Sequence, residues 1–155
     1  MSDLSDLLRP EAVLFGLAPA NRKALFVQLA AALAEQTGAD RAVIAERLAE
    51  REKLGSTGFG GGVAIPHGRI EGLAQVTAVF ARLAQPIEFQ AVDDGPVDLV
   101  WALLSPTGAG ADHLKALARV SRRLRDRAFL AKLRGAASPD ALYALFTQDR
   151  TRDAA

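Results

Sequence analysis

Two histidines stand where the hydrophobic pattern of the chain breaks, and these positions are candidates for chemistry. His67 follows the apolar segment Val63-Ala64-Ile65, which we expect to be a short strand, and it is held between a proline and a glycine. A neutral imidazole is a nucleophile near physiological pH. His113 follows Asp112 at the expected start of a helix, where the helix dipole disfavours a charged imidazole. We therefore predict a site built around neutral histidines, with His67 at its centre.

A glycine-rich loop and an arginine precede His67 and suit the same chemistry. Backbone without side chains can approach a ligand closely, and the loop runs into an apolar segment, unlike a flexible linker. Arg51 lies in the last turns of an expected helix, and its planar guanidinium matches phosphate oxygens. This set suits a phosphoryl group, which one imidazole attacks while the other groups stabilise its oxygens. Five of the 13 glycines fall in this loop, namely Gly55, Gly58, Gly60, Gly61 and Gly62.

Each candidate also has a purely structural interpretation, which the sequence leaves open. A histidine at a strand end is often structural, and His113 can face solvent from the first turn of its helix. Arg51 can form a salt bridge with Glu50 or Glu52. The two histidines and Asp112 lack the ligand spacing of a metal site, so we expect no metal and no cofactor. The loop also lacks the residues of a P-loop, of a dinucleotide fingerprint and of a serine hydrolase elbow.

Composition predicts one globular domain over residues 1–155, with a lead-in at 1–18 and a frayed tail at 148–155. The formal charge of +1 gives no bulk field that favours nucleic acid. No apolar run is long enough to insert in a membrane, and the acidic N-terminus does not resemble a signal peptide. The absence of cysteine excludes disulfides and suits a reducing compartment, so we expect a cytoplasmic protein.

The chain predicts an α/β fold, because residues 97–104 form an almost wholly apolar strand that must be covered on both faces. Further strands are expected at 76–83 and, as a short edge strand, at 86–89. Helices are expected from Asn21 to residue 36, from Asp40 to residue 54, from Asp112 to residue 126, at 127–133 and after Ser138. In the helix after Asp112 we expect a buried stripe and an arginine-rich outer face. The stripe contains Leu114, Leu117, Val120, Ser121 and Leu124, and the outer face contains Arg119, Arg122, Arg123 and Arg125.

A longer pattern resembles a known family. The segment from Arg51 to Gly58 (REKLGSTG), followed by Ala64-Ile65-Pro66-His67-Gly68, is similar to the signature of enzyme IIA domains of the bacterial phosphoenolpyruvate-dependent phosphotransferase system, fructose/mannitol type. The likeness extends over nearly the whole chain through PIEF at 86–89, PVDLV at 96–100 and His113-Leu114 with Leu117. Because these motifs occur in a chain of a single domain, the sequence most resembles the nitrogen-regulatory branch of this family.

The resemblance implies a mixed central sheet with helices on both faces. It implies that His67 accepts a phosphoryl group from an HPr-type carrier protein, while His113 and Arg51 assist. Gly55, Ser56, Gly58 and Gly68 would shape the pocket. It implies regulation by phosphorylation, in nitrogen- or potassium-related signalling, through target proteins that the sequence does not identify. The alternative is a sugar-transport IIA component that passes its phosphate to a fructose/mannitol-type IIB domain.

Overall fold

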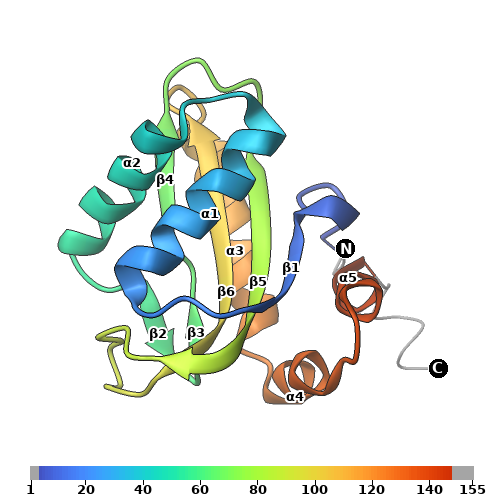
Figure 1. Cartoon of the computed structure of the whole chain (residues 1–155). Coiled ribbons are helices and arrows are strands. Elements are labelled where there is room, and N and C mark those ends of the chain that lie inside the picture. Colours follow the sequence, from blue (N-terminus) through green and yellow to red (C-terminus); the bar gives the residue numbers. More distant parts are fainter. Residues whose placement is uncertain (1–3, 148–155) are drawn as a thin grey trace.

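A mixed six-stranded sheet forms the centre of the computed structural model, which describes residues 4–147 (Figure 1). The strand order is β1-β5-β6-β3-β2, and β4 also pairs with β6. The pairing of β5 with β6 is antiparallel, whereas β1 is parallel to β5 and both β3 and β4 are parallel to β6. The strands are β1 (Val13–Leu17), β2 (Gly58–Gly60), β3 (Val63–Ala64), β4 (His67–Ile70), β5 (Thr77–Ile87) and β6 (Val97–Pro106).

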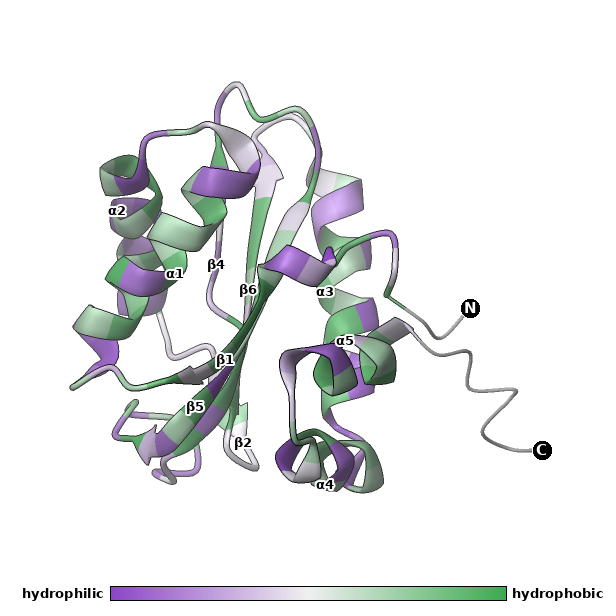
Figure 2. Cartoon of the chain, turned by 45° about the vertical axis from the view of Figure 1, so that its right-hand side comes forward, coloured by the Kyte–Doolittle hydropathy of each residue, from purple (hydrophilic) through white to green (hydrophobic). Residues whose placement is uncertain are grey.

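Helices cover both faces of this sheet, as the α/β prediction required. In Figures 1 and 2, α1 (Arg22–Thr37) and α2 (Arg41–Lys53) lie on one face. On the other face lie α3 (Gly110–Leu124), α4 (Arg127–Gly135) and α5 (Pro139–Thr147). A short 3-10 turn, η1 (Pro10–Ala12), precedes β1. Among residues 4–147 no helix has the length and apolar character that crossing a membrane requires.

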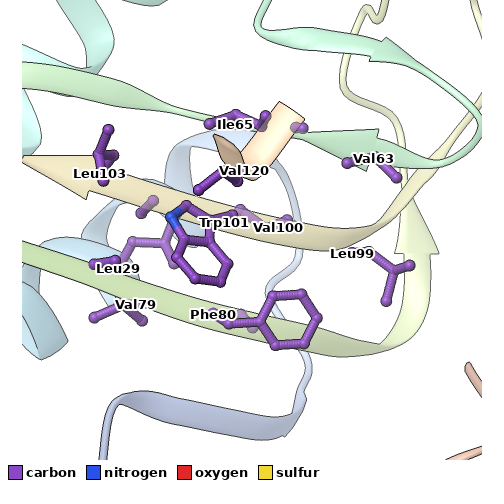
Figure 3. Close-up of a cluster of buried hydrophobic side chains, with 14 of the residues drawn as sticks. Leu29, Val63, Ile65, Val79, Phe80, Leu99, Val100, Trp101, Leu103 and Val120 are labelled. Atoms are coloured by element: carbon purple, nitrogen blue, oxygen red, sulfur yellow. The ribbon is translucent and has the colours of Figure 1, made fainter. Parts of the chain in front are cut away.

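The two long central strands, β5 and β6, pass through the middle of the core (Figure 3). Every residue of β6 from Leu99 to Ser105 is fully buried, which confirms that this apolar strand is covered on both faces. On the α5 side, Phe146 packs edge-on against Phe80 and Trp101 with ring centroids 4.6 and 5.2 Å away. Burial of large aromatic side chains contributes strongly to stability. The site described below therefore rests on a rigid strand.

The predicted starts of three helices are confirmed by their capping contacts. Asn21 Oδ1 accepts a hydrogen bond from the N–H of Ala24 at the start of α1, and Asp40 Oδ1 accepts one at the start of α2. Ser138 Oγ caps α5 in the same way. A side-chain oxygen at this position satisfies a backbone donor that has no partner within the helix. Gly38 ends α1 with a φ of +78°, a conformation that favours glycine.

One strand prediction needs correction. The segment at 86–89 is no separate edge strand, because β5 continues through Pro86 to Ile87, which pairs with Val97 of β6. The register shifts between Arg82 and Ile87, and such an irregularity tolerates a proline. The predicted lead-in contains β1, which pairs with β5 in parallel at the edge of the sheet. The predicted tail at 148–155 lies outside the described residues.

The helix expected from Asp112 starts earlier than predicted, and its buried face differs in part from the predicted one. It begins at Gly110 without a side-chain cap, so Asp112 is a first-turn residue. His113 is buried, whereas Leu114, predicted to be in the core, is 64% exposed. Arg123 was predicted on the outer face but is buried, where its guanidinium lies 3.9 Å from the centroid of the Phe129 ring. Val120 and Leu124 of the predicted stripe are buried, so the prediction is wrong for only part of this face.

Candidate functional site

His67 stands at an interruption between two strands that both pair with β6. The chain pairs with β6 through β3, breaks at Ile65 and Pro66, and pairs again through β4, whose first residue is His67. His67 Nδ1 lies 2.7 Å from the carbonyl oxygen of Ile65. Because a carbonyl oxygen only accepts hydrogen bonds, Nδ1 must carry the proton and donate it. The neutral ring therefore keeps its free lone pair on Nε2.

His113 approaches His67 from α3, on a different element of the fold. The two ring centroids are 5.5 Å apart, and the ring planes are inclined by 52°. His113 is only 4% exposed, and its Nδ1 lies 2.6 Å from Ser105 Oγ in β6. The prediction that the two histidines belong to one site is thus supported by their proximity, although 46 positions separate them in sequence.

Burial keeps both imidazoles uncharged at neutral pH. Desolvation is the largest cause that lowers the pKa of His67, and it is opposed by the hydrogen bond to Ile65; the nearby positive charge of Arg51 lowers this pKa further. Desolvation, with smaller effects of His67 and Arg69, lowers the pKa of His113 to about 4. The predicted neutral state of His113 therefore follows mainly from burial, whereas the sequence argument attributed it to the helix dipole.

Arg51 lies beside the histidines, and its predicted alternative role is not observed. Its guanidinium donates a hydrogen bond to the carbonyl oxygen of Gly55 at 2.9 Å, across the end of α2. Within residues 4–147 it forms no salt bridge with Glu50 or Glu52, which pair with other arginines. The contact with Gly55 holds a cation near His67 without neutralising its charge.

A surface depression surrounds the two histidines and reaches around the edge of the sheet at β4. The wall from α2 includes Arg47, Arg51 and the exposed Leu54. The opposite wall, from α3, includes Leu114 and Leu117. Cationic groups and exposed leucines therefore lie around the same pair of imidazoles, an arrangement that can accept both an anion and an apolar protein surface.

The structure places only one of the four predicted pocket-shaping residues in this depression. Gly68 lines it, and a Cβ at this position would lie 3.3 Å from the Cβ of Arg47, so glycine allows α2 to approach β4 closely. Gly55, Ser56 and Gly58 do not line it. Ser56 Oγ accepts a hydrogen bond from the N–H of Gly58 at 3.0 Å, which stabilises the loop itself.

The expectation that glycine-loop amides bind the phosphoryl group is not supported by their contacts. The N–H groups of Gly55 and Thr57 donate to Glu52, through its backbone and side-chain oxygens respectively. The N–H of Gly61, at the turn between β2 and β3, donates to Asp93. This turn precedes His67 by several residues of extended chain, each adding about 3.3 Å. The glycines therefore shape the turn and the end of α2.

Arg69 was missed by the sequence analysis, although the alternation of a strand could have indicated it. Side chains two positions apart in a strand share a face, so Arg69 lies on the same side of β4 as His67. It lines the depression, and its charge contributes to lowering the pKa of both histidines. Among residues 4–147 its guanidinium has no hydrogen-bond or ion-pair partner. Arg69 is thus a free cation beside the histidines.

No metal site accompanies these residues. Within the described part of the chain, no three side chains of histidine, cysteine, aspartate or glutamate lie close enough together to hold a metal ion. The side chains that line the depression around the two histidines are mainly arginines and leucines, and they include Glu50.

A mixed sheet covered on both faces, with two neutral histidines and arginines at one edge, defines a class of phosphotransferase protein, and the comparisons agree. The family described as "Phosphoenolpyruvate-dependent sugar phosphotransferase system, EIIA 2" matches residues 6–149. The chain belongs to this enzyme IIA family. The fold is also similar to that of IIA mannitol from Escherichia coli, with a TM-score of 0.76, 20% identity and coverage of 90% of this chain and 99% of the other.

Within the family, the chain is similar to nitrogen regulatory proteins. It is 49% identical to the nitrogen regulatory protein of Bradyrhizobium diazoefficiens over 142 residues, which cover 92% of this chain and 93% of the relative. The crystal structure of nitrogen regulatory protein IIA-Ntr from Neisseria meningitidis superimposes with a TM-score of 0.87 and 34% identity, over 92% of this chain and 97% of the other. The resemblance to the nitrogen-regulatory branch and the predicted fold are both confirmed.

Proposed function

We propose that His67 accepts a phosphoryl group on Nε2 from a phosphorylated HPr-type carrier, in the cytoplasm. The observation that supports this most directly is the 2.7 Å contact between His67 Nδ1 and the carbonyl oxygen of Ile65. That contact occupies one ring nitrogen as a donor and leaves the other as the nucleophile. Partial burial keeps the ring neutral, so the lone pair is present at physiological pH.

The transferred group moves between two imidazoles. The bond from phosphorus to the carrier's imidazole nitrogen breaks, and its electron pair stays on the leaving ring. A new bond forms from the lone pair of His67 Nε2 to phosphorus, while the proton on Nδ1 stays hydrogen-bonded to Ile65. Phosphoryl transfer passes through a loose transition state, so positioning and charge stabilisation are the main contributions a protein can make.

Three groups around His67 are suited to the developing charge on the phosphoryl oxygens. Arg51 and Arg69 are cations that line the depression. His113 is neutral and can donate one hydrogen bond through its imidazole N–H. Arg69, which lacks a partner among the described residues, is available without breaking an existing interaction. These groups make a metal ion unnecessary for the transfer.

Docking of the carrier would use the apolar rim of the same depression. Leu54 is 85% exposed and Leu114 is 64% exposed, and they approach the histidines from α2 and α3 respectively. Large exposed apolar side chains around a functional site are typical of protein contacts. The phosphorylated site then carries about two additional negative charges. We propose that this change controls binding of regulatory targets at the same rim, in nitrogen- or potassium-related signalling.

The test is phosphorylation of the full chain with labelled phosphoenolpyruvate, the first enzyme of the system and its HPr-type carrier. We expect a stoichiometric label that is lost in acid and retained in alkali, as a phosphorus–nitrogen bond requires. A label that survives acid, or no label with an active carrier, would contradict the proposal. Adding a fructose/mannitol-type IIB domain afterwards separates the two roles, because transfer of the label to that domain would favour sugar transport over regulation.

Replacing Arg69 tests the contribution of the free cation. We expect Arg69→Gln to lower the kcat/KM of phosphoryl transfer about ten- to a hundredfold, since a hydrogen bond to a charged group is lost. Arg69→Lys should recover part of the rate, because lysine restores the positive charge but not the planar guanidinium that can donate two parallel hydrogen bonds to phosphate oxygens. The matched control is Arg127→Gln, which removes the same charge from an exposed position in α4. Equal kcat/KM values for Arg69→Gln and Arg127→Gln would mean that Arg69 does not take part in phosphoryl transfer.

A further inference from the structure

We propose that Ser105 is a positioning residue that donates its hydroxyl proton to His113 Nδ1 and so holds the imidazole proton of His113 on Nε2. This inference deepens the proposed function, on which its role in phosphoryl transfer rests. Ser105 Oγ and His113 Nδ1 are 2.6 Å apart, a short contact between two nearly inaccessible groups. Ser105 lies near the end of β6.

The position of Ser105 connects the two elements that carry the site. It lies in β6 directly opposite Arg69 of β4, two residues after Leu103, which is opposite His67. Ser105 therefore shares a sheet face with Leu103. Its residue surface is 0% exposed, so its hydroxyl is shielded from bulk solvent. The hydroxyl must find its hydrogen-bond partner within the protein.

The direction of this hydrogen bond follows from what else the hydroxyl can reach. A serine hydroxyl can donate or accept, and an imidazole nitrogen can do either according to its tautomer. Within residues 4–147, His113 Nδ1 is the partner that the Ser105 hydroxyl has. If Ser105 accepted a proton from Nδ1, its own O–H would remain buried without an acceptor, which is unfavourable. The hydroxyl therefore donates, and Nδ1 accepts.

The consequence is that the two histidines are held in opposite tautomers. The Ile65 carbonyl keeps the proton of His67 on Nδ1, so Nε2 presents a lone pair. Ser105 keeps the proton of His113 on Nε2, so that nitrogen presents a donor. A lone pair and a donor on adjacent rings suit a phosphoryl group between them, where one nitrogen bonds phosphorus and the other donates to an oxygen. In the other tautomer, His113 would direct a lone pair at anionic oxygens.

The tautomers can be measured by ¹⁵N NMR on the unphosphorylated full chain at pH 7, where two histidines give a simple spectrum. Long-range ¹H–¹⁵N correlations distinguish a protonated ring nitrogen from an unprotonated one, and His67→Gln assigns the remaining ring. We expect His113 protonated on Nε2 in the wild type. Protonation of His113 on Nδ1 would overturn the proposal, and this measurement needs no substitution at Ser105.

Substitution then tests the causal role of the hydroxyl. We expect Ser105→Ala to give a mixture of His113 tautomers and to slow phosphoryl transfer roughly three- to tenfold. Ser105→Thr keeps the hydroxyl and should restore the single tautomer. Ser121→Ala in α3 is the matched control and should change neither. An unchanged tautomer in Ser105→Ala would overturn the proposal.

The proposed function and the role of Ser105 are tested by different measurements, so each can fail without the other. If the wild-type chain accepts no label from an active carrier, the proposed function fails, and the tautomer still reports whether Ser105 orients His113. If the chain is labelled but His113 carries its proton on Nδ1, the role of Ser105 alone is wrong.

Discussion

His67→Gln is expected to abolish phosphorylation of the chain, whereas His113→Gln should keep the acceptor and slow the transfer roughly 10²- to 10³-fold. The difference follows from geometry. His67 has a free Nε2, and glutamine offers no comparable nucleophile. His113 supplies a hydrogen-bond donor 5.5 Å away, ring centre to ring centre, and its loss removes stabilisation from the transition state. Label incorporation under single-turnover conditions measures both effects.

The two glutamine variants also serve as controls for each other. Both remove one imidazole from the same depression and both keep a polar side chain of similar length. Thermal unfolding of each variant shows whether a loss of labelling comes from a loss of folding. Full labelling of His67→Gln, or no labelling of His113→Gln at long times, would reverse the roles assigned to the two rings. The acceptor nitrogen can be verified by ³¹P–¹⁵N correlation in the labelled wild type.

The sequence was sufficient for the frame of the fold because its local signals agree with one another. Asn21, Asp40 and Ser138 each precede a helical pattern, and each caps the helix that follows. The apolar run that became β6 could only be a strand covered on both faces. Where no capping side chain exists, as at the start of α3, the predicted cap Asp112 lies three residues after the actual N-cap, Ala109. The buried face was also misjudged in the first turn, where His113 is buried and Leu114 is exposed.

The site was predicted as a set of residues but not as a set of contacts. His67, His113 and Arg51 were identified, and the structure brings them to one depression. The glycine loop was assigned to the ligand because glycine permits close approach, yet its amides are already used by Glu52 and Asp93. The contact of Gly61 with Asp93 is long-range and could not be read from the local pattern, whereas the contacts with Glu52 span three to five positions at the end of α2.

Ser105 illustrates a different limit of sequence reasoning. Its hydroxyl matters only because α3 places His113 Nδ1 2.6 Å from it, across eight positions of chain that include a loop. A serine at the end of a strand carries no other sequence signal that would mark it as part of a site. Arg69 was more accessible to prediction, since strand alternation places it beside His67 once β4 is recognised as a strand.

Acidification should destabilise the fold through His113, which is the second large effect we expect. An unfolded chain binds a proton at the ordinary histidine pKa of 6.5, whereas burial lowers the pKa of folded His113 to about 4. Between these values the unfolded state binds more protons, so stability falls as the pH falls. From this residue alone, the free energy of unfolding should fall by roughly 3 kcal/mol at pH 4. This loss is a large part of the roughly 5–15 kcal/mol that is typical of a domain.

Urea unfolding at pH 7 and at pH 4.5 measures this effect in the wild type and in His113→Gln. We expect the wild type to lose more stability than the variant between the two pH values, and comparing the changes cancels the constant cost of the substitution. Asp6 and Asp93 have a lowered pKa, so their contributions are lost below their ordinary value of 3.8, outside this window. Identical losses in both proteins would mean that His113 is protonated as readily in the fold as in water. A ring so easily charged would carry protons on both nitrogens, so its Nδ1 could not accept the hydroxyl proton of Ser105.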